Sequence, residues 1–226
     1  MKTVWITRTQ PFAQRSAARF KDAGFHPIIA PLLLIGPPPV IPPMPPRGAV
    51  LIFTSQNGLN AFCGLSDFRG HAVVTVGNAT AGAVRKAGFT DVISADGTAK
   101  DVAPLILQNP LRSSPYWHIA GRHVRGSIIE DLRTAGLSAA RHVFYISRPV
   151  DRLPKIDISS IDFVALYSPL AAKTLAALSP DMSQAAIVSI SAETDAALGA
   201  FDVGRRIVAD TPNEESMLVS LIALTA

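Results

Sequence analysis

The sequence predicts an α/β protein made of two similar domains, each built on a parallel sheet covered by helices. Short apolar runs alternate with helix-like segments along almost the whole chain of 226 residues. These runs do not alternate between polar and apolar residues, which is typical of strands buried on both faces. Four blocks of sequence also recur in the same order after about 113 residues. We therefore expect two copies of one α/β unit.

The strand and helix signals can be placed along the chain in order. Glycines 24, 88 and 136 end three of the helical segments, in the left-handed position that favours glycine. Helix-like stretches also follow each of the last three strands. The strands are expected at 4–7, 26–35, 49–55, 72–78, 91–95, 116–121, 140–147, 163–168, 185–191 and 206–210. The helices that precede the last three strands, including the three that end at glycine, are expected at 10–24, 58–65, 79–88, 101–109 and 124–136.

The repeat and two connectors predict how the chain is divided. Residues 4–35 recur as 116–147, with Trp5 aligned on Trp117, and the segment LIFTSQNGLNAF recurs as VALYSPLAAKTL. Residues 36–47 hold seven of the 18 prolines and read as a stiff connector, and residues 147–160 form a second one. We expect a discontinuous first domain (1–35 plus 161–226), an inserted second domain (48–146) and a two-stranded linker. A plain tandem of two units is the alternative.

Composition excludes several classes of protein. The chain is 48% hydrophobic and only 17% charged, which excludes disorder and coiled coil. Prolines interrupt the most apolar stretch, so no membrane span is expected, and the N-terminus lacks an apolar signal core. A cytoplasmic location follows as the expectation. The single Cys63 and the five histidines lack ligand-like spacing, so we expect no metal site of the zinc or iron–sulfur type.

The charge pattern suggests a small anionic ligand. The net charge is +4, and 15 of the 21 basic residues are arginine, which binds planar carboxylates in pairs. Lys/Arg runs are absent and aromatic residues are 7%, so nucleic acid is not an expected partner. A basic surface without any partner explains the same numbers.

Small and hydroxylic residues recur where the predicted strands end. Such turns place free N–H groups at the carboxyl edge of a parallel sheet, where ligands bind. Ordinary helix capping explains any single one of them, and Tyr145 alone reads as a packed edge residue. Dinucleotide, P-loop and serine-hydrolase motifs are absent. The turns contain Ser55, Gly77–Thr80, Gly121–Arg122, Ser168–Pro169 and Ser191–Thr194.

Several of these segments resemble uroporphyrinogen-III synthases. The resemblance rests on LIFTSQNGLNAF, VGNATAGAVRKAGF, the strand ending in VFY, YSPLAAKTL and the tail IVADTPNEESMLVSLI, in that order over nearly the whole chain. It implies two flavodoxin-like domains on a two-stranded linker, with the active site in the cleft between them. It also implies cyclisation of hydroxymethylbilane to uroporphyrinogen III, with loss of water, inversion of ring D and no cofactor. The substrate that the resemblance implies is a polycarboxylate tetrapyrrole, which agrees with the small anionic ligand suggested by the arginine content.

The resemblance also implies roles for individual residues. Thr80 and Tyr145 would be catalytic, with Tyr145 donating a proton to the leaving hydroxyl or orienting it. The family usually has glycine in the turn where Ser191 stands and a small residue in place of Asp195, an acid that would repel a carboxylate near Thr194. Substrate carboxylates would be bound by Arg8, Ser55, Gly77, Asn78, Ala79, Gly121, Arg122, Ser168 and Thr194.

Two other functions fit the sequence. One is a non-catalytic binding or regulatory protein of the same fold that recognises a polycarboxylate. The other is a two-lobed small-anion-binding protein, which the absence of a signal peptide disfavours. For the enzyme, we expect a monomer that takes its substrate transiently from hydroxymethylbilane synthase.

Overall fold

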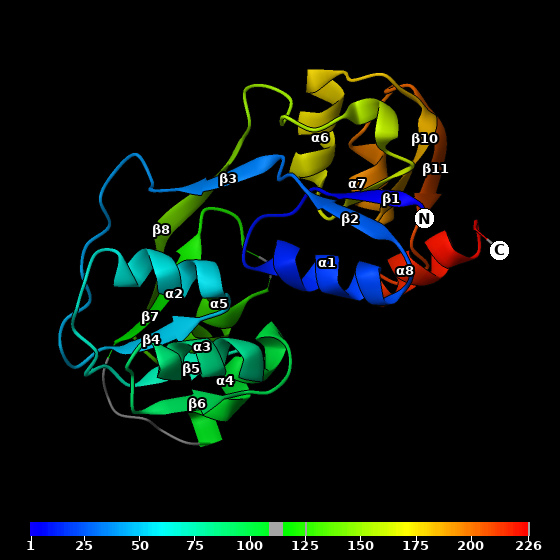
Figure 1. Cartoon of the computed structure of the whole chain (residues 1–226). Coiled ribbons are helices and arrows are strands. Elements are labelled where there is room, and N and C mark those ends of the chain that lie inside the picture. The colour runs from blue at the N-terminus through cyan, green and yellow to red at the C-terminus, as the bar shows by residue number, and fades with distance from the viewer. Residues whose placement is uncertain (109–114, 125, 226) are drawn as a thin grey trace. The chain divides into compact units, whose positions relative to one another are not determined.

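The computed structural model describes residues 1–108, 115–124 and 126–225 (Figure 1). The chain forms two compact units, Met1–Leu34 with Arg148–Ala226 (unit 1) and Ile35–Ser147 (unit 2). Each unit contains one sheet with helices on both faces. Residue 109, the predicted end of one helix, and residue 125, within another, lie outside the described residues.

Unit 1 contains a five-stranded sheet in the order β11-β10-β9-β1-β2, and all neighbouring strands are parallel. Numbered along the chain, this is the order 2-1-3-4-5 of flavodoxin-like sheets. Helices α1 and α8 cover one face, and α6 and α7 cover the other. The strands are β1 (Thr3–Ile6), β2 (His26–Ile29), β9 (Phe163–Leu166), β10 (Met182–Ser189) and β11 (Val203–Val208), and the helices are α1 (Phe12–Asp22), α6 (Pro169–Leu178), α7 (Ala192–Ala196) and α8 (Glu214–Ile222), with a 3₁₀ turn at Ile158–Ser160.

Unit 2 contains a six-stranded sheet in the order β3-β8-β7-β4-β5-β6. Within this sheet the pairs β4–β5, β4–β7, β5–β6 and β7–β8 are parallel. Helices α2 and α3 pack on one face, and α4 and α5 pack on the other. The strands are β3 (Leu33–Gly36), β4 (Val50–Phe53), β5 (Val73–Thr75), β6 (Val92–Ser94), β7 (Tyr116–Gly121) and β8 (Ala139–Pro149), and the helices are α2 (Gln56–Cys63), α3 (Asn78–Lys86), α4 (Ala99–Gln108) and α5 (Ile128–Thr134).

The sequence repeat is present in the topology. The order β11-β10-β9-β1-β2 of unit 1 corresponds strand for strand to β6-β5-β4-β7-β8 of unit 2. Trp5 on β1 lies beside Val164 of β9, and Trp117 on β7 lies beside Leu51 of β4. The predicted α/β class with parallel sheets is confirmed. Unit 2 is a permuted copy, because its chain enters at the strand equivalent to β9.

The apolar run at 26–35 was predicted to form one strand, and this prediction is wrong. The run forms β2 and β3, which belong to different sheets. Pro31 lies in the gap between them, and prolines are rare inside sheet strands. On the other side, β8 continues to Pro149 and pairs with β3. The chain therefore changes from one unit to the other within two paired strands, which include the first residues of the predicted connectors 36–47 and 147–160.

Candidate functional site

The carboxyl edge of the unit 2 sheet brings Ser55 and Tyr145 together. Strand β4 is followed by a helix on one face of this sheet and β7 by a helix on the other, so the strand order reverses between them. Ligands of open α/β sheets bind at this switch point. Ser55 directly follows the turn after β4, and Tyr145 lies on β8. Their hydroxyl oxygens are 3.2 Å apart, within hydrogen-bond distance.

Local geometry explains how Ser55 comes to this position. Its backbone is extended (φ −156°, ψ 157°), and it is the N-cap of α2. Its Oγ accepts a hydrogen bond from the Gly58 N–H at 3.4 Å. A Cβ at Gly58 would lie 2.5 Å from the Ile119 carbonyl oxygen of β7. Glycine is therefore what allows the first turn of α2, and with it Ser55, to approach β7.

Gly121, an expected substrate contact, also leaves room for the Tyr145 ring. A Cβ at Gly121 would lie 2.8 Å from ring atoms of Tyr145. The register of β7 and β8 shifts between Ala120 and Gly121, so that Gly121 lies opposite Tyr145. The Arg122 N–H also donates to the Tyr145 carbonyl at 3.2 Å. Gly121 therefore provides the space in which the Tyr145 ring lies, and the side chain of Arg122 is exposed.

The turn after β5 lies beside the first turn of α2. Gly77 is the N-cap of α3, and a Cβ there would meet no atom within 4 Å. Asn78 and Ala79 are exposed in the first turn, where backbone N–H groups have no partner within the helix. Thr80 is half-buried, and its N–H donates to the Gly77 carbonyl. The Gln56 side chain donates to the Ala79 carbonyl at 3.2 Å, which links this turn to α2.

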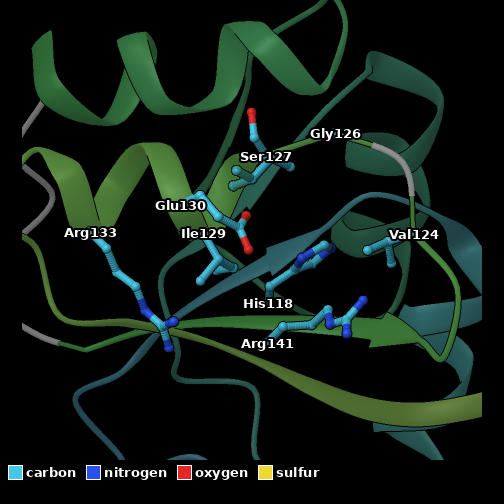
Figure 2. A pocket seen from close by; sticks show the side chains of 9 residues that line it. His118, Val124, Gly126, Ser127, Ile129, Glu130, Arg133 and Arg141 are labelled. Carbon is cyan, nitrogen blue, oxygen red and sulfur yellow. The ribbon is translucent and has the colours of Figure 1, made fainter.

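A histidine that the sequence analysis had set aside lies on the other face of the same edge. His118 of β7 is 3% exposed, and its Nε2 is 3.3 Å from Thr54 Oγ1. Burial, together with the nearby Arg141 charge, lowers the pKa of His118 to about 4, and the Glu130 charge partly opposes this shift. His118 is therefore neutral at pH 7. It lines a pocket of about 480 Å³ between α5 and the sheet (Figure 2).

In unit 1, Arg8 follows β1 and is bound within the unit. Its guanidinium lies 4.5 Å from the ring centroid of Tyr167 and 5.1 Å from that of Phe12. Its Nη1 is 3.6 Å from a carboxylate oxygen of Glu214. Ser168 begins α6 as the predicted N-cap before Pro169, and its Oγ accepts from the Ala171 N–H at 3.2 Å.

Glu214 of α8 is the centre of this network, which the sequence did not reveal. It is 9% exposed, and it accepts a hydrogen bond from the Tyr167 hydroxyl at 2.8 Å. Arg19 approaches its other oxygen at 3.3 Å. Burial, reinforced by the Glu214 charge, raises the pKa of Tyr167. The switch point of unit 1, between β1 and β9, is thus occupied by the chain's own carboxylate.

The expected contact through Thr194 is not supported by its position. The Thr194 side chain is 0% exposed and is hydrogen-bonded to Ser191, whose Oγ is 3.1 Å away. The Thr194 side chain is therefore enclosed within unit 1 and offers no exposed surface to a ligand. Asp195, the acid expected to repel a carboxylate, is paired with Arg206 at 3.0 Å. The departure from the family pattern at this turn is therefore compensated within unit 1.

Within residues 1–108, 115–124 and 126–225, no group of three or more His, Cys, Asp or Glu side chains is placed to hold a metal ion. None of the helices in that part of the chain is both long and apolar enough to cross a membrane.

Comparison with known proteins decides the family. A family model described as uroporphyrinogen-III synthase HemD matches residues 14–219. The chain belongs to the uroporphyrinogen-III synthase family. The solved uroporphyrinogen-III synthetase of Helicobacter pylori 26695 shares the fold, with a TM-score of 0.63 at 16% identity, over 99% of this chain and 100% of that one. A mutant synthase from the extremely thermophilic bacterium Thermus thermophilus gives 0.48 at 14% identity, over 100% of both chains. No curated protein matches the chain.

Proposed function

We propose that the protein is a uroporphyrinogen-III synthase that acts as a cyclising hydro-lyase on hydroxymethylbilane. The family membership supports the overall reaction. The observation that carries the site assignment is the hydroxyl pair of Ser55 and Tyr145 at the switch point of unit 2, at 3.2 Å. The alternative of a non-catalytic binding protein finds no support, because the two departures at Ser191 and Asp195 are satisfied within unit 1.

The hydroxyl pair is suited to help the first step of this reaction. The Gly58 N–H donates to Ser55 Oγ, so the Ser55 O–H is available to donate to Tyr145. In that arrangement the Tyr145 O–H is directed at the leaving hydroxyl of the substrate. Protonation there breaks the C–O bond and releases water, and Ser55 stabilises the developing tyrosinate. The azafulvenium cation that remains is stabilised by its own pyrrole nitrogen, and the pyrrole proton released when the macrocycle closes restores Tyr145.

The second demand on the protein is conformational. Ring D must attack through a spiro intermediate before unassisted closure gives the wrong isomer. We propose that backbone N–H groups of Asn78 and Ala79, at the start of α3, hold a substrate carboxylate. Thr80, half-buried beside them, would orient the substrate. The predicted contacts through Arg8, Arg122 and Ser168 belong to the same proposal.

The decisive experiment is a coupled assay with hydroxymethylbilane made enzymatically in the same tube. The products are oxidised, and the type I and type III isomers are separated by chromatography. We expect type III to dominate when the protein is present. If only the type I isomer of spontaneous closure forms, the proposed function is wrong.

The short lifetime of free hydroxymethylbilane affects how the enzyme should receive its substrate. Because free hydroxymethylbilane closes spontaneously, transfer from hydroxymethylbilane synthase without long diffusion would limit the loss. We propose a monomeric cytoplasmic enzyme that works in this way. Light scattering at assay concentration tests the oligomeric state, and competition by an excess of the slow Tyr145→Phe variant tests the transfer.

A further inference from the structure

The His118 pocket, lined by His118, Val124, Gly126–Glu130, Arg133 and Arg141, has no part in the mechanism above. It lies on the α5 face of the unit 2 sheet. Its charged side chains are those of Arg133, Arg141 and Glu130, because His118 is neutral at pH 7. The pocket therefore carries one net positive charge, which suits a single anionic group.

The pocket adjoins the Ser55–Tyr145 pair through two consecutive residues. Thr54 is 3.3 Å from His118, and Ser55 is 3.2 Å from Tyr145. Because the backbone at Ser55 is extended, the side chains of Thr54 and Ser55 point to opposite faces of the sheet. The two groups thus lie on either side of one carboxyl edge.

Arg141 presents a guanidinium to this pocket. Figure 2 shows the side chains of Arg141 and Glu130 on either side of the His118 ring. Among the described residues, the hydrogen bond of the Arg141 side chain goes to the Arg122 carbonyl, at the long distance of 3.5 Å. By contrast, Arg133 Nε is held by the Ala139 carbonyl at 2.7 Å. Arg141 therefore retains donors in the planar arrangement that pairs with a carboxylate.

We propose that the His118 pocket is a carboxylate subsite for the tetrapyrrole, with Arg141 as its charged contact. This inference rests on the proposed function. The linear substrate bends over the carboxyl edge of the sheet, with its leaving group at Tyr145 and one acetate or propionate at Arg141. Holding the chain on both faces of the edge restricts it to folded conformations, which favours attack by ring D.

Kinetics of three variants test the subsite. Arg141→Gln removes the charge and the planar donors, Arg141→Lys keeps only the charge, and Arg85→Gln removes an exposed charge at the other end of α3 as a control. We expect Arg141→Gln to raise KM about tenfold and to lower kcat by a smaller factor, because the bound substrate is less restricted to folded conformations. The KM of Arg141→Lys should lie between that of the wild type and that of Arg141→Gln, and the KM of Arg85→Gln should match the wild type. An unchanged KM in Arg141→Gln, or an equal rise in Arg85→Gln, overturns the subsite.

Binding separates this inference from the proposed function. Protein labelled with ¹⁵N-arginine is titrated with uroporphyrinogen III under reducing conditions, and separately with acetate and with phosphate. The Arg141 Nε–H signal, assigned from its loss in Arg141→Gln, should shift with uroporphyrinogen III. If it responds to phosphate or acetate but not to the tetrapyrrole, the tetrapyrrole subsite is wrong. This titration remains decisive even if the protein forms no type III isomer, a result that would remove the proposed function alone.

Discussion

The two units share a sheet order but differ at the point where that order reverses. In unit 2, the hydroxyls of Ser55 and Tyr145 meet at the carboxyl edge and remain partly accessible. In unit 1, Glu214 occupies the equivalent edge and binds Tyr167, Arg8 and Arg19. We call the edge of unit 2, where no carboxylate of the described residues is bound to its tyrosine, the open edge, and the edge of unit 1, which holds Glu214, the closed edge. This difference teaches that the topology supplies a location for a site, whereas a few side chains decide whether a ligand can use it.

The largest effect should come from the tyrosine at each switch point. We expect Tyr145→Phe to lower kcat by roughly 10²-fold or more, because the proton donor to the leaving hydroxyl is lost. Tyr167→Phe is the matched variant in unit 1, and it should keep nearly the wild-type kcat. Steady-state assays of both variants with hydroxymethylbilane measure this. Full activity of Tyr145→Phe would remove its proposed role and leave the two edges equivalent.

The units should also respond to opposite extremes of pH. The unfolded chain protonates a histidine near pH 6.5, whereas His118 in unit 2 has a pKa of about 4. The free energy of unfolding should therefore fall by roughly 3 kcal/mol as the pH drops from 6.5 to 4. In unit 1 the raised pKa of Tyr167 means that stability should fall as the pH rises above about 10, where the unfolded tyrosine ionises.

Urea unfolding across this pH range measures both losses. Trp117 reports on unit 2 in a Trp5→Phe variant, and Trp5 reports on unit 1 in a Trp117→Phe variant. His118→Asn should reduce the decrease in the free energy of unfolding at acid pH, and Tyr167→Phe should reduce the decrease at alkaline pH. An acid loss of the same size in His118→Asn would show that other groups cause it.

The closed edge of unit 1 should depend on the charge of Glu214. Glu214→Gln leaves Arg8 and the Tyr167 hydroxyl without their carboxylate, and we expect it to lower the free energy of unfolding by about 2 kcal/mol. The estimate is moderate because Arg8 and Arg19 are partly exposed. Glu215→Gln, one residue along α8 and exposed, is the control. Equal urea midpoints for the two variants would contradict the importance of the network.

The open edge of unit 2 should depend on the space at Gly121. In Gly121→Ala the added Cβ would press on the Tyr145 ring, whose nearest atoms would be 2.8 Å away. We expect a loss of about 1 kcal/mol in stability and a several-fold lower kcat, because the ring moves from Ser55. Gly82→Ala, in α3 with no atom near the new Cβ, should lose neither. A Gly121→Ala enzyme with normal kcat would show that the position of the ring is not critical.

The local features of the fold could be predicted from the sequence. Unalternated apolar runs indicated parallel strands, and Ser55 and Ser168 marked two helix starts as N-caps. The internal repeat predicted two equivalent sheets. The run at 26–35 was misread because its two halves are equally apolar, and the pattern does not say which sheet each half joins. Pro31 was the available signal.

The site was only partly predictable, because its key contacts join distant residues. Thr54 and His118 are 64 residues apart, and Tyr167 and Glu214 are 47 apart. Such pairs depend on strand register and helix placement, which residue patterns do not encode. Tyr145 was identified through the family resemblance, and the space provided by Gly58 and Gly121 became visible only in the structure. Arg141 was not singled out, since one exposed arginine among 15 carries no pattern.

The strand order of unit 1 has a consequence for synthesis of the chain on the ribosome. Strand β1 is translated first, but its neighbour β9 begins only at Phe163. At about 5–20 residues per second, the partner emerges roughly 10–30 s later. Unit 2, a continuous stretch, is complete before then. The nascent protein therefore carries a finished sheet in its middle while its earliest strand still has an open edge, which is the moment at which a chaperone would protect it most.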